Sequence, residues 1–154
     1  MSNELILMLH PTFGVLAILG SMWVFVETLN ARTANEGRIR LASLSVAGLM
    51  WLAYIVGGFW YVFYYAGDKA LIKAGPWPFA HGLVMESKEH IFLSLLLLAS
   101  FLPIAAFSNI VANRGARHLV LTVAALVVLT GLAMEGAGAF ISMGVKVALL
   151  AKQV

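Results

Sequence analysis

The sequence contains no cysteine among its 154 residues. Disulfide bonds, thiolate metal sites, covalently attached c-type haem and cysteine nucleophiles are therefore excluded. Charged residues are also scarce, because they make up 11% of the chain, whereas a typical soluble domain has about 25%. A chain with so little polar surface cannot cover a water-soluble globule of this size.

A signal peptide and a nucleic-acid patch are missing as well. The N-terminus has neither a Lys/Arg-rich start nor a small-residue cleavage site, so the first apolar segment is expected to be a permanent helix. The net charge is only +3. Its basic residues fall in short loops, where they act as topology signals rather than as a surface for nucleic acid.

What the sequence does have is long apolar segments, and 62% of its residues are hydrophobic. Segments of about 20 apolar residues match the thickness of a bilayer. Four of them, joined by short polar loops, predict an all-α integral membrane protein, a four-transmembrane-helix up-down-up-down bundle that forms one domain over residues 1–154. Pro103 is expected to bend the third helix near its end. The predicted helices cover roughly residues 5–29, 41–65, 81–109 and 118–142.

The arginines indicate an orientation. All five lie in the first and third loops, on one side of the predicted bundle, whereas the lysines lie on the other side. Short basic loops favour the cytoplasmic face. We therefore expect a multi-pass protein of a bacterial-type inner membrane with the following arginines in the cytoplasm: Arg32, Arg38, Arg40, Arg114 and Arg117.

Ionisable residues within apolar helices are the candidates for function, because burying them in a membrane is costly. The up-down order of the helices places His10 and His90 on the same side of the membrane at similar depth. Helix 4 brings Glu135 toward them, and the aromatic end of helix 2 lies nearby. The candidates are His10, Glu27, Glu86, Glu89, His90, His118 and Glu135.

The faces of these helices favour a flat cofactor. Helical periodicity puts small residues one and two turns from His10, which leaves a slot beside the imidazole. Two neutral imidazoles from different helices can supply both axial ligands of haem iron. The shared faces are His10, Gly14, Ala17 and Ser21 on helix 1; Glu86, His90, Ser94 and Leu97 on helix 3; and Gly131, Glu135, Gly138 and Ser142 on helix 4.

The resulting hypothesis is one haem b whose iron is ligated by His10 and His90. His81, about 13 Å before His90 along a continuous helix, is the reserve ligand. Lys88 and the aromatic groups would neutralise the propionates. The further cofactor contacts are predicted to be Gly14, Tyr61, Tyr65, Lys88 and Glu135.

Three other interpretations stay open. Small residues can simply allow close helix packing, with the histidines hydrogen-bonded inside the bundle. A non-haem metal could use Glu86, Glu89, His90, Glu135 and His10, although Glu86 and His90 do not have the spacing of the Glu-x-x-His pairs of di-iron bundles. A small transporter could use Glu135, although no discontinuous helix is indicated.

Three short motifs carry a resemblance to a known group. Leu9-His10-Pro11-Thr12, Glu89-His90-Ile91 and Ala116-Arg117-His118 resemble segments of a small group of four-helix bacterial membrane proteins linked to haem-copper oxidase assembly. More loosely, the chain resembles four-helix b-type membrane cytochromes. The sequence departs from the first group because helix 2 has no histidine. The resemblance implies that His10 and His90 bind haem b.

The expected function is that of a membrane-embedded b-type cytochrome or cytochrome-like electron-transfer subunit. The alternative is a non-enzymatic accessory or assembly subunit of a respiratory membrane complex. The expected partners are the lipid bilayer, a quinone, and other membrane subunits or further copies of the chain. No nucleic-acid partner is expected.

Overall fold

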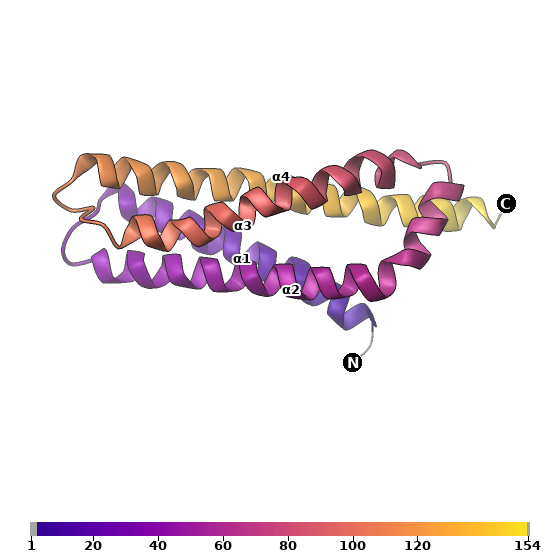
Figure 1. The fold of residues 1–154 in the computed structure, drawn as a ribbon, viewed down its shortest axis with the longest axis horizontal. Coiled ribbons are helices and arrows are strands. Elements are labelled where there is room, and N and C mark those ends of the chain that lie inside the picture. Colours follow the sequence, from indigo (N-terminus) through magenta and orange to yellow (C-terminus); the bar gives the residue numbers. More distant parts are fainter. Residues whose placement is uncertain (1–2, 154) are drawn as a thin grey trace.

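The computed structural model describes residues 3–153, and every element in that range is helical. A short π-helix, η1 (Ala80–Met85), runs directly into the third long helix. The long helices lie alongside one another, with the α1–α2 and α3–α4 loops at the same end of the molecule (Figure 1). They are α1 (Asn3–Leu29), α2 (Glu36–Ala74), α3 (Glu86–Ala106) and α4 (Arg114–Ala151).

Four helical segments are long and apolar enough to cross a membrane, and the third of them consists of η1 and α3 together. Large apolar side chains point outward along all of them, for example Val62, Leu97 and Leu129, which are 70%, 71% and 64% exposed. In water such a surface would be costly, whereas lipid matches it. The prediction of an all-helical chain with four candidate spans is confirmed, as expected for a multi-pass membrane protein.

Two helices are longer than the sequence predicted. α2 continues past Tyr65 to Ala74, and α4 continues past Ser142 to Ala151. In Figure 1 the last turns of α2 leave the direction of its main part, and Ile72 and Gly75 pack there against Gly144 and Ala148 of α4. The charged residues after Tyr65 resembled a loop, but this packing keeps the segment helical until Gly75-Pro76.

The interior falls into two clusters. The larger one lies toward the end that carries the two arginine-containing loops, which we call the arginine end; we call the opposite end the lysine end. Small and branched side chains such as Ala17, Val46, Ala99 and Val127 are fully buried in the larger cluster. Tyr65, Ile72, Ala80, Met85 and Ile141 form the smaller cluster at the lysine end.

The loops at the arginine end are fastened by Arg117. Its Nε donates to the carbonyl of Ile110, and its Nη2 donates to the carbonyls of Val111 and Ala31. One guanidinium therefore connects the start of α4 to both loops, and it satisfies carbonyl groups of the loop backbone.

Candidate functional site

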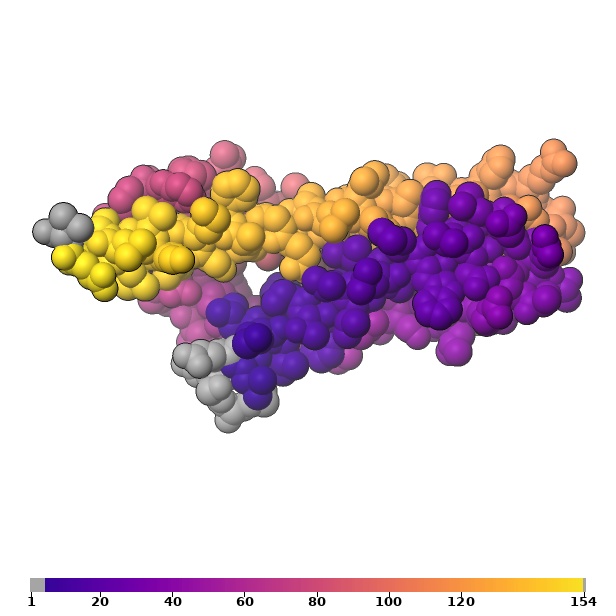
Figure 2. Space-filling view, turned by 180° about the vertical axis from the view of Figure 1, so that it is seen from behind, coloured from indigo at the N-terminus to yellow at the C-terminus, as the bar shows by residue number. Residues whose placement is uncertain are grey.

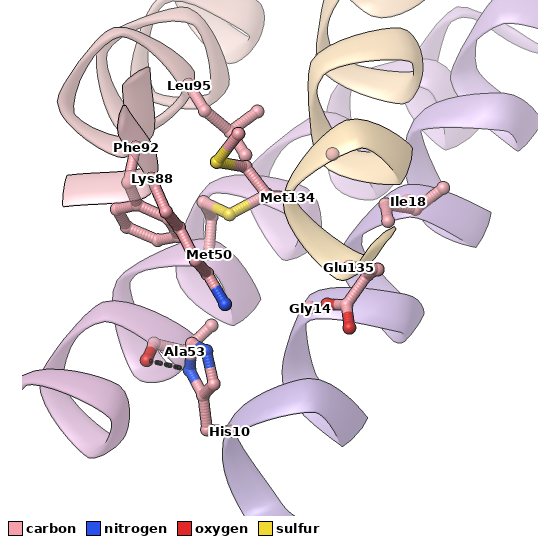
Figure 3. Close-up of a pocket in the computed structure, with 11 residues that line it drawn as sticks. His10, Gly14, Ile18, Met50, Ala53, Lys88, Phe92, Leu95, Met134 and Glu135 are labelled. Atoms are coloured by element: carbon pink, nitrogen blue, oxygen red, sulfur yellow. Dashed lines mark hydrogen bonds between the residues drawn. The ribbon is translucent and has the colours of Figure 1, made fainter. Parts of the chain in front are cut away.

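Three ionisable side chains from three helices line one pocket. His10 comes from α1, Lys88 from α3 and Glu135 from α4, and Figure 3 shows their polar ends around a common space. The enclosed part of the pocket is about 10 Å³, room for about one water molecule. The other lining residues are apolar: Gly14, Ile18, Met50, Ala53, Phe92, Leu95, Gly131 and Met134.

His10 is held in one orientation by α2. Its Nδ1 lies 2.8 Å from the carbonyl oxygen of Ala53. Because a carbonyl can only accept, Nδ1 carries the proton, and in the neutral ring Nε2 remains as an acceptor or ligand. The ring packs on Gly57, where a Cβ would approach Nδ1 to 2.5 Å. An alanine at position 57 would thus displace the imidazole.

Glu135 and Lys88 also lie against glycines of neighbouring helices. The Glu135 carboxylate occupies the place where a Cβ of Gly14 would be, and the Lys88 Nζ would be 3.0 Å from a Cβ of Gly138. Among residues 5–153, whose side chains the structure describes, the ion pairs are Arg38–Glu27 and Arg40–Glu36, both toward the arginine end. Lys88 and Glu135 are therefore not paired with each other, and both remain available at the pocket.

The pocket opens to one side of the bundle. His10, Lys88 and Glu135 are each only partly buried. Seen from behind, the surface is hollowed between the start of α1 and the middle of α4 (Figure 2). Toward the arginine end, the same helices pack closely around the apolar cluster that contains Ala17 and Val127. The pocket is therefore reached from the side, between α1 and α4.

Four of the residues predicted to contact a cofactor meet in this pocket: His10, Gly14, Lys88 and Glu135. His90 does not line it. His90 is exposed, and its Nδ1 bonds to the carbonyl of Glu86 one turn earlier, at 2.7 Å. The pairing of His10 with His90 around one iron therefore gains no support from this arrangement and stays a prediction.

The predicted Tyr61 and Tyr65 lie elsewhere, in the cluster at the lysine end. Their rings stack at a centroid distance of 5.1 Å. The buried hydroxyl of Tyr65 lies 3.1 Å from Nδ1 of His81, which is itself buried in η1. This pair was not foreseen, because Tyr65 and His81 are separated by a loop and only the bend of α2 brings them together.

The remaining candidates have simpler surroundings. Glu27 pairs with Arg38 at the start of α2 and accepts a hydrogen bond from Asn35. Glu86, Glu89 and His118 are exposed. Among the side chains that the structure describes, those of residues 5–153, no group of three or more His, Cys, Asp or Glu is placed to hold a metal ion, so the non-haem metal interpretation gains no support.

Comparison with known proteins found no matching family model, no matching curated protein and no matching solved structure. The resemblance to oxidase-assembly proteins and b-type cytochromes therefore remains a sequence-based prediction. The pocket of His10, Lys88 and Glu135 is the feature from which a function can be inferred.

Proposed function

We propose that this protein is an inner-membrane electron-transfer subunit that binds the head group of a quinone in the pocket of His10, Lys88 and Glu135. The observation that carries the proposal is the convergence of these three polar side chains, from three helices, on one pocket with apolar walls. Ionisable groups within apolar spans indicate a functional site by default.

In the proposed arrangement the four helices cross the membrane in up-down-up-down order with the arginine end in the cytoplasm. Glu135 follows Arg117 by 18 residues along α4, which corresponds to about 27 Å along a helix. The hydrocarbon core of a bilayer is about 30 Å thick. If Arg117 marks one boundary, the pocket lies close to the opposite one, at the depth where an amphiphile keeps its polar head.

The polar groups suit both redox forms of a quinone. The carbonyl oxygens of the oxidised ring accept hydrogen bonds, and the Lys88 ammonium can donate one. The hydroxyl groups of the reduced ring donate, and they would meet two acceptors, Nε2 of His10 and the carboxylate of Glu135. Phe92, Met50 and Met134 supply apolar and sulfur contacts to the face of a ring.

A single ring suits this pocket better than a macrocycle does. The space enclosed between the side chains is only about 10 Å³, close to the room of one water molecule, so the flexible side chains must move aside for any ligand. One substituted six-membered ring needs far less room than a tetrapyrrole. The hollow between α1 and α4 in Figure 2 gives an isoprenoid tail a route into the lipid.

Haem b on His10 is the second candidate, and one observation favours it. A histidine that ligates a metal commonly donates its other ring nitrogen to a backbone carbonyl, as His10 does to Ala53. Lys88 would then pair with a propionate. The residues fit only in part, because His90 faces away from the pocket and the Glu135 carboxylate fills the notch at Gly14.

The test is ligand binding by the purified full chain in lipid nanodiscs. Titration with a short-tail ubiquinone should give saturable binding, and His10→Ala, Lys88→Met and Glu135→Gln should each weaken it about tenfold, a loss of about 1.4 kcal/mol. His118→Ala is the matched control, because this exposed histidine lies at the arginine end. Its affinity should stay within about twofold of the wild type.

Visible absorption spectra separate the alternatives. A Soret band in protein from haem-replete cells, abolished by His10→Ala, would favour haem over quinone, and its survival in His90→Ala would argue against the bis-histidine pairing. Protein that binds no quinone and shows no Soret band would refute both redox proposals and leave the accessory-subunit interpretation.

A further inference from the structure

The three polar side chains of the pocket have one geometric feature in common. Each lies over a glycine of the next helix around the bundle, where an added Cβ would crowd it. The side chain and its glycine come from different helices in every case. The three pairs are His10 (α1) on Gly57 (α2), Lys88 (α3) on Gly138 (α4), and Glu135 (α4) on Gly14 (α1).

These glycines differ from those that serve helix packing. A Cβ at Gly144 would lie 2.8 Å from the Cβ of Ala80, and a Cβ at Gly75 would lie 3.1 Å from the backbone Cα of Ala148. Such neighbours can move only if the helices separate. A Cβ at Gly14 or Gly138 would instead meet the far end of a flexible side chain, which can rotate away at little cost.

We infer that Gly14 and Gly138 are positioning residues that hold the Glu135 carboxylate and the Lys88 ammonium apart, on opposite sides of the pocket. This inference depends on the proposed binding site and adds a reason why its two charged groups do not pair with each other. Because Gly14 and Gly138 have no side chain, the Glu135 carboxylate and the Lys88 ammonium each lie against the backbone of a neighbouring helix. The pocket between these two groups then remains accessible to a ligand.

A methyl group in either notch removes this separation. The displaced polar end moves toward the pocket, which both side chains line. There it approaches the oppositely charged partner, and attraction between opposite charges is strong in surroundings of low dielectric constant. The resulting Lys88–Glu135 ion pair would fill the pocket and use the groups that a ligand needs, without opening the helix interface.

The test uses four glycine-to-alanine variants of the full chain in nanodiscs. Gly14→Ala and Gly138→Ala are the test variants. Gly136→Ala and Gly58→Ala are the matched controls, because a Cβ at either position meets nothing within 4 Å. All four should fold and melt close to the wild type. Binding of the short-tail ubiquinone should weaken about tenfold in the test variants and stay within about twofold in the controls.

A second readout does not depend on any ligand. A carbodiimide condenses a carboxylate with an amine in direct contact, with loss of water, so peptide mass spectrometry after treatment reports a Lys88–Glu135 pair as an amide cross-link. The cross-link should be several times more abundant in Gly14→Ala and Gly138→Ala than in the wild type and both controls. Adding Glu135→Gln to Gly14→Ala should abolish it.

The two readouts separate the two proposals. Equal cross-linking in test and control variants would overturn the positioning role, even if the wild type binds quinone. Increased cross-linking in the test variants, in a protein that binds no quinone in any form, would support the positioning role and refute the proposed ligand. Loss of the folded state in Gly14→Ala would also contradict the inference, because it would assign Gly14 to helix packing.

Discussion

The two ends of the bundle use the same four helices in different ways. At the arginine end, small and branched side chains such as Ala17, Val24 and Ala124 are fully buried, and the helices are packed closely. At the lysine end, the last turns of α2 turn toward α4 (Figure 1), and polar side chains lie against glycines of neighbouring helices.

This difference shows how a small membrane protein makes space for a site. In lipid, apolar side chains gain little by leaving their surroundings, so close packing of small residues holds helices together. The arginine end uses its alanines for that purpose. Toward the lysine end, polar side chains rather than a neighbouring helix pack against Gly14 and Gly138. A pocket remains between these polar side chains.

The largest expected effect concerns the orientation of the two ends. The chain has no cysteine, so single cysteines can be introduced at Ala34, in the first arginine loop, and at Ala74, at the end of α2; both are exposed. A membrane-impermeant maleimide should label Ala74→Cys in intact spheroplasts and Ala34→Cys only after lysis, because short basic loops favour the cytoplasm.

Residues beside these positions would be poor labelling sites. Asn35 is buried and bonded to Glu27, and Gly75 packs against Ala148. Labelling of Ala34→Cys from outside, with Ala74→Cys protected until lysis, would reverse the proposed orientation. Labelling of both positions in intact spheroplasts would contradict the single span, α2, between them.

The second effect concerns the stability of the arginine end. Arg117→Ala removes the hydrogen bonds to Ile110, Val111 and Ala31 that fasten both loops. Hydrogen bonds from a charged donor contribute about 1.5–3 kcal/mol each, and bonds that share one side chain do not add fully, so a loss of about 2–4 kcal/mol is expected. Unfolding in nanodiscs or micelles, followed by steric trapping, measures it.

Arg114→Ala is the matched control for Arg117→Ala. Arg114 lies one turn earlier and is exposed, so its replacement should change the free energy of unfolding by less than about 0.5 kcal/mol. Similar losses in the two variants would mean that net charge, rather than the bonds of Arg117, stabilises the loops.

The number and approximate positions of the helices could be predicted because they depend on length and apolarity alone. The ends of α2 and α4 could not. Asp68, Lys69 and Lys73 resemble a polar loop, yet Ile72 between them is buried against Gly144. That contact joins residues far apart in the sequence, and the bend that creates it leaves no local signal.

The candidate site was predicted in part, and the missing part has a clear cause. The order of the helices correctly placed His10 and Glu135 at a similar depth along the bundle. The predicted inward face of α1 also points inward; it consists of His10, Gly14, Ala17 and Ser21. On α3 the predicted face of His90 is exposed, and Lys88 and Phe92, two residues to either side of His90, face the pocket. Two residues are about 200° of helical rotation.

The sequence of α3 therefore does not specify how this helix is rotated about its own axis. In water, the polar face of a helix turns outward and marks its rotation. In lipid, both faces of α3 carry leucines and the outward face needs no polar residues. Only the packing of neighbouring helices decides which residues reach the centre.

The smallest expected effect tests whether packing, rather than polar bonding, holds the arginine half of the bundle. The fully buried hydroxyl of Ser21 donates to the carbonyl of Ala124 on α4, at 3.0 Å. Hydrogen bonds between membrane helices contribute about 0.6 kcal/mol on average and at most about 1.7 kcal/mol. Ser21→Ala should therefore lower the free energy of unfolding by about 0.6 kcal/mol, far less than Arg117→Ala. Ser45→Ala is the matched control, because its exposed hydroxyl bonds only to Leu41 one turn earlier in α2, and it should cause no measurable change. A loss above about 2 kcal/mol in Ser21→Ala, beyond what such a bond contributes, would show that polar bonding holds this half as well and would remove the contrast between the two ends.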